Sequence, residues 1–250
     1  MICAAQQNNG AAPATHRQGG AKTMWVVVPV KPFALAKRRL GAILSEGERA
    51  LLARAMFTDL LATLAGCARI SGVLVVTREK AVAPIAAGFG VVVLPEVEPG
   101  LSKAVLQGAR YLCEQNVNSL LMLPTDVPLA RSAEIDQVVA RHGWAPAVTL
   151  VSDEAGYGTN AIAVSPPDLL NFRFGRRSFE AHRAAAIAAG ARVQVVRAPG
   201  LALDVDTPDD LRRLLAYDLP IATIALLLEH DVLSRLAPRP IVSAGGQWNL

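Results

Sequence analysis

The sequence predicts one α/β domain in which short buried strands alternate with amphipathic helices. Apolar runs rich in Val and Leu recur between Pro, Gly and polar residues, as in parallel strands that helices cover on both faces. Longer segments between these runs place apolar residues at helical spacing. The chain has 250 residues, and one domain of about 200 residues buries a sufficient core.

The predicted elements follow one another in a regular order. Met24–Val30 is a continuous apolar run, typical of a buried strand, and Glu46–Leu64 has the apolar spacing of a helix. Two strands without a helix between them begin at Ala147, which indicates a departure from the parallel order such as an antiparallel insertion. The same patterns predict strands at 72–77, 91–94, 119–123, 147–151, 161–164 and 192–196, and helices at 101–114, 132–141 and 178–189.

The last helix of the domain, at 207–216, has a well-marked start. Thr207 is expected to cap it, Pro208 suits its first turn, and Asp209 and Asp210 lie near its positive end.

The chain divides into three parts. Residues 1–22 are rich in Gly, Ala, Gln and Asn without an apolar period, so we expect a disordered extension. Residues 23–217 form the expected domain, and residues 218–250 form a tail with one helix at Ala222–Leu236. This apolar tail can pack on the domain or on a neighbouring copy, so a homodimer is one alternative.

The composition argues against several classes of protein. The net charge is +4, and the basic residues do not form the stripe with interleaved aromatics that indicates nucleic-acid binding. The apolar run Ile221–Leu228 is too short to span a bilayer. Three widely spaced cysteines match no zinc pattern and fit a reducing compartment. We therefore expect a cytoplasmic protein that binds neither nucleic acid nor membrane.

Basic residues follow the first predicted strand. Lys31 lies directly after it, and Lys37, Arg38 and Arg39 lie a few residues further on. Because ligands of open α/β sheets bind at the carboxyl ends of the strands, this segment is a candidate phosphate-binding loop, although it lacks the GxxxxGK[ST] pattern. The alternative is a solvated basic loop, which is the ordinary place of surface charge.

An aspartate follows the strand at 119–123. Asp126 lies between Pro124 and Pro128, whose restricted backbone angles present its side chain rigidly. A hard divalent cation prefers such a fixed carboxylate as a ligand. The alternative is a turn aspartate that caps the next helix.

Two more aspartates, Asp204 and Asp206, follow the apolar run Leu201–Leu203, which we take as a strand. In extended backbone their side chains point to the same side. Carboxylates placed in this way repel each other unless a cation or a basic group lies between them.

Two segments are candidate anion-binding loops. Gly156–Asn160 is a Gly-rich turn that ends in a hydroxyl and an amide, and Phe174–Phe179 opens a helix. Ser178 is expected to cap that helix while the free N–H groups face an anion. His182 lies one turn along the same face, where a lone histidine is more often structural than catalytic. Together with the cations and carboxylates, these loops suit nucleotidyl transfer, in which catalysis is mostly positioning and charge neutralisation.

Six motifs occur in the order of a known family: VPVKPFALAKRRL, GLSKAVLQG, LPTDVPL, GTNA, FGRRSFEAH and DVDTPDDL. In these motifs, which span residues 24–216, the sequence resembles the guanylyltransferases that make the side-chain precursor of the deazaflavin coenzyme F-420. Those enzymes use GTP and 2-phospho-L-lactate, phosphoenolpyruvate or 3-phospho-D-glycerate. The resemblance implies a single-domain nucleotidyltransferase with a Rossmann-like, GT-A-type sheet and helices on both of its faces.

The resemblance also implies roles for individual residues. Ser102 is the expected nucleotide contact, although related members commonly have Gly-Leu-Asn where this chain has Gly100-Leu101-Ser102. The resemblance makes Asp126, Asp204 and Asp206 ligands of Mg2+. Lys31 would contact the nucleotide phosphates or the acceptor, and Lys37 and Arg39 would neutralise the leaving pyrophosphate. Thr159, Gly175 and Ser178 would bind the phosphate of the acceptor.

Two other functions stay open at this point. One is a nucleotidyltransferase for a molybdopterin or a sugar phosphate, but those relatives usually carry a GxGxR loop where this chain has the residues 29–32. The other is a catalytically inactive nucleotide-binding regulator, which is expected to have lost the carboxylates. The carboxylates Asp126, Asp204 and Asp206 are all present, so we expect a Mg2+-dependent guanylyltransferase that uses GTP.

Overall fold

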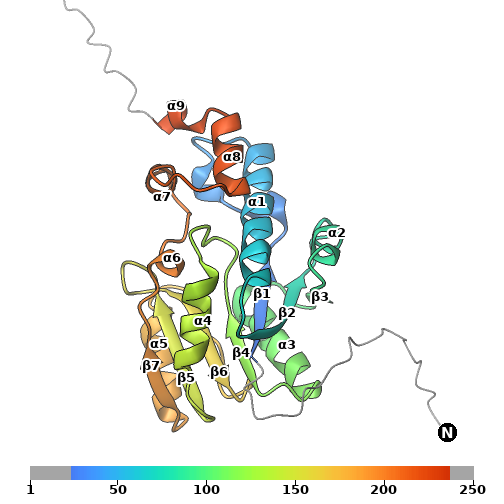
Figure 1. The fold of residues 1–250 in the computed structure, drawn as a ribbon, viewed down its shortest axis with the longest axis vertical. Helices are drawn as coiled ribbons and strands as arrows, with labels where there is room; N and C mark the ends of the chain where they lie inside the picture. The colour runs from blue at the N-terminus through green and yellow to red at the C-terminus, as the bar shows by residue number, and fades with distance from the viewer. Residues whose placement is uncertain (1–23, 237–250) are drawn as a thin grey trace, which may run out of the picture.

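A seven-stranded mixed sheet lies at the centre of the protein (Figure 1). The computed structural model describes residues 24–236, so the expected disorder of residues 1–22 and the end of the tail lie outside the described residues. The strands lie in the order β3-β2-β1-β4-β6-β5-β7. They are β1 (Met24–Val30), β2 (Ile70–Thr77), β3 (Val92–Pro95), β4 (Ser119–Met122), β5 (Ala147–Ser152), β6 (Thr159–Ser165) and β7 (Arg192–Val195).

The strand β6 departs from the parallel order, as the sequence predicted. It runs antiparallel to both of its neighbours, β4 and β5, whereas β1, β2, β3 and β4 pair in parallel and β5 pairs in parallel with β7. As a result, the amino end of β6 lies at the same edge of the sheet as the carboxyl end of β4.

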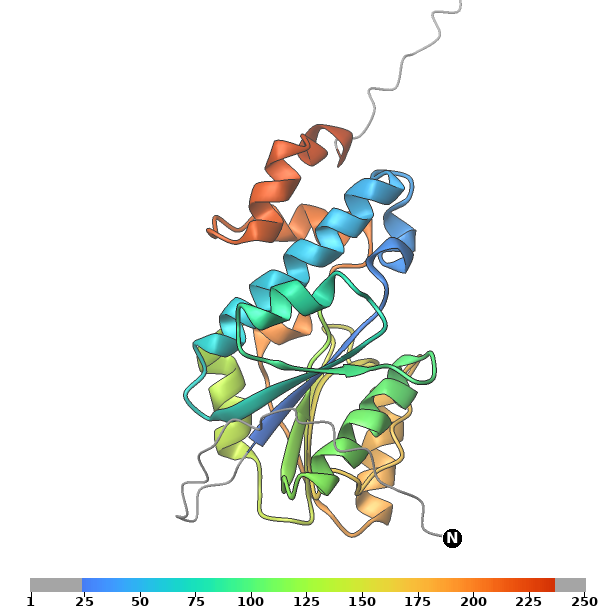
Figure 2. The same cartoon turned by 90° about the vertical axis from the view of Figure 1, so that its right-hand side faces the viewer.

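Helices cover both faces of the sheet, which confirms the predicted fold class. The helices α1, α2 and α4 pack on one face, and α3 and α5 pack on the other (Figure 2). The helices are α1 (Glu46–Ala65), α2 (Val82–Ala87), α3 (Leu101–Glu114), α4 (Ser132–Arg141), α5 (Ser178–Ala188), α6 (Pro199–Ala202), α7 (Pro208–Leu214), α8 (Ala222–Glu229) and α9 (Val232–Leu236), with 3-10 turns η1 (Phe33–Leu35) and η2 (Arg38–Leu40).

Alternate residues of β1 supply the two core layers. Val26 and Val28 pack in the cluster that contains Phe57 of α1, and Val27 packs in the cluster that contains Val105 of α3. All of these side chains are fully buried. The continuous apolar run of β1 is therefore explained by burial on both faces of the sheet.

Two predicted elements differ in the structure. Leu201–Leu203 is not a strand, because Pro199–Ala202 forms the short helix α6, whose Gly200 N–H donates to Glu134 Oε1 at 3.0 Å. Up to Leu236 the tail holds two helices rather than one, because Asp231 between them has a φ of 48°, outside the helical region.

The first tail helix packs against the domain (Figure 2). Asp59 of α1 accepts hydrogen bonds from the N–H groups of Ala222 and Thr223, both at 2.8 Å, and so satisfies free donors at the start of α8. Leu227 of α8 is buried in a cluster with Leu52 of α1. The described part of the tail therefore follows the first of the two alternatives, packing on its own domain. Within residues 24–236, every helix is too short or too polar to cross a membrane.

Candidate active site

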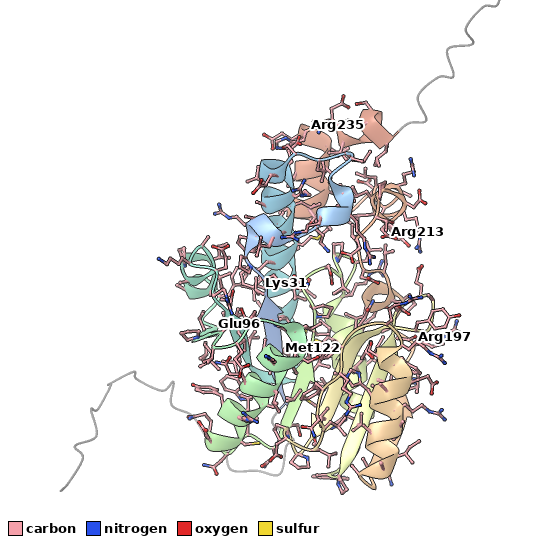
Figure 3. All side chains as sticks on the ribbon, turned by 180° about the vertical axis from the view of Figure 1, so that it is seen from behind. Lys31, Glu96, Met122, Arg197, Arg213 and Arg235 are labelled. Atoms are coloured by element: carbon pink, nitrogen blue, oxygen red, sulfur yellow. The ribbon has the colours of Figure 1, made fainter. Side chains whose placement is uncertain are left out.

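The candidate site lies at the edge of the sheet where β1 and β4 end. A cavity of about 380 Å³ opens there, which is within the range of small-molecule sites. Lys31 and Glu96, both labelled in Figure 3, line this cavity. Five further charged residues also line it: Lys37, Arg38, Arg39, Asp126 and Asp206.

Lys37 forms the centre of the charged site. It precedes η2 in the left-handed conformation, with a φ of 53°, and only 6% of its side chain is exposed. Its Nζ donates to Asp126 Oδ2 at 3.0 Å and to Asp206 Oδ1 at 3.1 Å. Burial by itself lowers the pKa of Lys37, but attraction by Asp126 and then by Asp206 outweighs burial and raises that pKa above its ordinary value. Lys37 is therefore a permanent cation between two carboxylates.

Asp204 completes what we call the carboxylate cluster, Asp126, Asp204 and Asp206. Burial raises the pKa of Asp204, and repulsion by the other two carboxylates raises it further, although a hydrogen bond from Asn160 Nδ2 at 3.2 Å opposes the shift. The Val205 N–H donates to the Asp126 carbonyl at 2.9 Å and ties the two loops together. The structure thus brings Asp126 together with the two aspartates of a loop that lies about 80 residues further along the chain.

The charges of the cluster are unevenly matched. The ammonium of Lys37 bonds to two of the three carboxylates and, among the described residues, Asp204 has only the amide of Asn160 as its side-chain partner. Arg39, which is 76% exposed, approaches Asp206 only to 3.9 Å. Among residues 24–236, no three acidic, His or Cys side chains are already arranged as a metal-binding group. The cluster nevertheless presents the hard oxygen donors that Mg2+ prefers, together with an excess of negative charge.

The strand β6 and the helix α5 build a second polar group. We call Thr159 and Ser178 the hydroxyl pair, because Ser178 Oγ donates to Thr159 Oγ1 at 3.2 Å. His182 Nδ1 lies 3.0 Å from the same Thr159 oxygen. All three residues are buried. Thr159 is the first residue of an antiparallel strand, which explains how it reaches the edge where the parallel strands end.

The expected capping role of Ser178 is wrong. The cap position of α5 is Arg177, in the left-handed conformation with a φ of 60°, and the Ser178 hydroxyl bonds to Thr159 instead. Gly175 has a φ of 139°, which only glycine adopts readily. Within the described part of the chain, no hydrogen-bond partner is found for the N–H groups of Arg176 and Arg177. The loop therefore keeps free donors that suit an anion.

The other proposed anion loop is less open than expected. In the turn 156–160, the Tyr157 N–H already donates to Asp153 Oδ1 at 2.8 Å, so the carboxylate of Asp153 occupies the place of an anion. Ser102 also has a partner, because its hydroxyl accepts from the Phe174 N–H at 3.0 Å. This bond joins the start of α3, next to the cavity-lining Leu101, to the loop before α5.

Asn160, expected only as the amide at the end of an anion-binding loop, links the two polar groups. Asn160 follows Thr159 in the strand, and its amide reaches Asp204 as well as the carbonyls of Leu201 at 3.0 Å and Ala202 at 3.1 Å. The Gly-rich turn and the GTNA motif both point to this amide in the sequence, but neither predicts its bond to Asp204.

Comparison with known proteins places the chain in a family. Residues 24–219 match the family described as "Guanylyl transferase CofC like". The phosphoenolpyruvate guanylyltransferase of Rubrobacter xylanophilus is 39% identical over 192 residues, which cover 77% of this chain and 93% of that relative. The 3-phospho-D-glycerate guanylyltransferase of Colwellia psychrerythraea is 34% identical over 196 residues, which cover 78% and 93%.

Solved structures share the fold. A nucleotidyl transferase from Methanothermobacter has a TM-score of 0.56 at 18% identity, covering 78% of this chain and 96% of that one. A cytidylyltransferase from Leptospira borgpetersenii has a TM-score of 0.54 at 15% identity, covering 86% and 96%. With the family match over most of the chain, the conclusion is direct: this protein belongs to the CofC-like guanylyl transferases.

Proposed function

We propose that the protein transfers GMP from GTP to a small phosphorylated three-carbon acid, with release of pyrophosphate, in coenzyme F-420 biosynthesis. The acceptor is 3-phospho-D-glycerate, phosphoenolpyruvate or 2-phospho-L-lactate. The names of the relatives support two of these acids, and the resemblance in sequence motifs supports all three.

One observation carries the proposal. Thr159 and Asn160 are consecutive, yet the first belongs to the hydroxyl pair and the second binds Asp204 of the carboxylate cluster. An anion held by the hydroxyl pair and the free N–H groups before α5 would therefore be near the carboxylate cluster, whose Asp126 and Asp206 line the cavity. Such proximity is the main requirement for transfer between two bound phosphates.

The proposed reaction forms one bond and breaks one. An oxygen of the acceptor's phosphate attacks the α-phosphorus of GTP, and the bond between that phosphorus and the bridging oxygen of pyrophosphate breaks. The attacking phosphate is already ionised, so the protein needs no general base. Lys37 and Arg39 lie in the cavity wall, where they neutralise charge on the leaving pyrophosphate. Lys31 lies in the same wall, where it contacts the nucleotide phosphates or the acceptor.

The carboxylate cluster is the proposed Mg2+ site. Asp126, Asp204 and Asp206 would hold the ion, and the bound ion supplies neutralisation of charge on the reacting phosphates. The observed excess of negative charge and the raised pKa of Asp204 support this role, because both are relieved by a divalent cation.

Release of pyrophosphate tests the proposal directly. The protein is given GTP and Mg2+ with each of the three acids separately, and omission of Mg2+ and of acid provides the controls. We expect release with one acid and none without Mg2+. GTP binding without release for any acid would instead favour another acceptor or an inactive regulator.

A further inference from the structure

His182 is a buried histidine with a defined partner at each ring nitrogen. Its Nε2 accepts a hydrogen bond from the Arg173 N–H at 3.0 Å, and its Nδ1 lies 3.0 Å from Thr159 Oγ1. The side chain is fully buried. Burial lowers the pKa of His182 to about 4, so the ring is neutral at ordinary pH.

The Arg173 amide fixes the position of the single proton on this ring. A backbone N–H is always a donor, so Nε2 has to be the acceptor and cannot carry a proton. A neutral imidazole carries one N–H, which is therefore on Nδ1. It follows that His182 donates to Thr159, and that Thr159 Oγ1 accepts.

The hydroxyl pair then has one hydrogen to spare. Its two hydroxyls hold two hydrogens, and one of them lies in the bond between Ser178 and Thr159. Since the histidine donates to Thr159, the remaining hydroxyl hydrogen has no acceptor among these three side chains and is available to a ligand. With Ser178 as the donor inside the pair, that hydrogen belongs to Thr159.

Aromatic packing holds the ring in this orientation. The ring of Phe174 meets the His182 ring edge to face at a centroid distance of 4.7 Å, and Phe172 packs at 6.3 Å. Phe174 is itself anchored, because its N–H donates to Ser102 at the start of α3. The imidazole is therefore held by two hydrogen bonds and two aromatic contacts.

We infer that His182 is a positioning residue that turns the hydroxyl pair into a hydrogen-bond donor toward the phosphate of the acceptor acid. This inference rests on the proposed function, which places that phosphate at Thr159 and Ser178. A phosphate oxygen only accepts hydrogen bonds, so a hydroxyl whose hydrogen is turned outward binds it and one whose lone pair is turned outward repels it.

Three substitutions separate this role from packing. His182→Asn keeps a donor near the place of Nδ1, His182→Gln keeps an acceptor near the place of Nε2, and His182→Phe keeps the aromatic volume without either group. We expect KM for the acid to rise about tenfold in the Gln and Phe variants and clearly less in the Asn variant, as for loss of one hydrogen bond to a charged group. KM for GTP should change less than about twofold, because the acid alone loses a contact.

A purely structural role predicts the opposite order. Phe would then be the mildest change and Asn the most severe, since Asn leaves the largest gap between the two phenylalanine rings. That order of KM values for the acid, or equal values for all three variants, would overturn the inference. Melting temperatures of the variants provide the independent scale of structural damage.

The proton position can be read without turnover. A long-range ¹H–¹⁵N spectrum of the wild type, with the His182 signals assigned by their loss in His182→Phe, should show a neutral ring with its proton on Nδ1. A proton on Nε2 would overturn the inference. If the wild type uses no acid, the proposed function fails on its own, and this spectrum still decides the direction of the hydrogen bond.

Discussion

Lys37 and Asp126 form an ion pair of 3.0 Å although 89 residues separate them in the chain. The same ammonium binds Asp206 at 3.1 Å, so one lysine connects the loop after β1 with both acidic loops. Lys37 neutralises the carboxylate cluster and also lines the cavity. Its replacement should therefore change both the stability of the protein and its turnover.

Replacement of Lys37 by Met should separate these two effects. We expect turnover to fall at least about 100-fold, since a preorganised charge in the site is lost. The apo protein should also melt at a lower temperature, because the carboxylate cluster loses its buried cation. Mg2+ should raise the melting temperature of Lys37→Met more than that of the wild type, as measured by thermal denaturation with and without MgCl2. Equal Mg2+ shifts in the two proteins would contradict binding of the ion at this cluster.

Asp126→Asn should be more damaging to turnover than His182→Ala. The first change removes a charged ligand from the proposed Mg2+ site, for which we expect a loss of at least about 100-fold. The second removes a positioning residue, for which a loss of about tenfold is expected. Pyrophosphate release at saturating GTP and at an acid concentration below the wild-type KM measures both. Equal losses in the two variants would contradict the roles assigned to these residues.

Asn160→Asp should impair both stability and turnover. The amide of Asn160 donates to Asp204 and to two backbone carbonyls, and a carboxylate in its place would face three acceptors at close range. We expect a destabilisation of about 2 kcal/mol or more, from unfavourable pairing of buried acceptors. Urea unfolding measures it, with Asn160→Ala as the control that removes the bonds without adding charge. The prediction fails if the Asp variant is as stable as the Ala variant.

Helix caps and helix ends were predicted well, because they are determined by residues that are neighbours in the chain. Thr207 caps α7 as expected, and Asp210 completes a reciprocal capping box with it. Both ends of α3 and of α4 were also predicted, because their apolar spacing and polar flanks are local signals. In contrast, the apolar run Leu201–Leu203 had the composition of a strand, but the contact of Gly200 with Glu134 holds it in a short helix.

The candidate site was predicted as a set of residues but not as a geometry. The acidic residues and Lys37 were each recognised in the sequence, whereas the placement of Lys37 between Asp126 and Asp206 depends on the arrangement of three distant loops. The same limit applies to Ser178. As a serine before a helical segment it looked like a cap, but the neighbouring strand β6 offers Thr159 as a partner.

Acid should destabilise the protein through His182. Its pKa is 6.5 in the unfolded chain and about 4 in the folded protein, so the unfolded chain binds the proton more tightly. The contribution of the neutral ring is therefore fully present above about pH 6.5 and is lost as the pH falls toward 4. We expect a loss of about 2 kcal/mol between pH 7 and pH 5 from this group alone.

The variant His182→Phe isolates that contribution. Urea unfolding of wild type and variant at pH 7 and pH 5 gives two differences in the free energy of unfolding, in which the other titrating groups cancel. The wild type should lose more stability on acidification than the variant. Identical losses would show that His182 is not buried as a neutral ring.

Asp59→Ala should loosen α8 without changing the active site. The Asp59 carboxylate accepts from the Ala222 N–H, from the Thr223 N–H and from the Thr223 hydroxyl, the last at 2.5 Å. Loss of such a cap is expected to cost about 1–2 kcal/mol and to speed amide exchange at the start of α8. Asp59→Asn keeps one acceptor oxygen and should cost less.

The KM values for GTP and acid should not change, because none of the bonded groups lines the cavity. A shifted KM in Asp59→Ala would instead show that the tail helices help to shape the site, through the cluster in which Leu227 of α8 packs with Met56, a residue of the cavity wall.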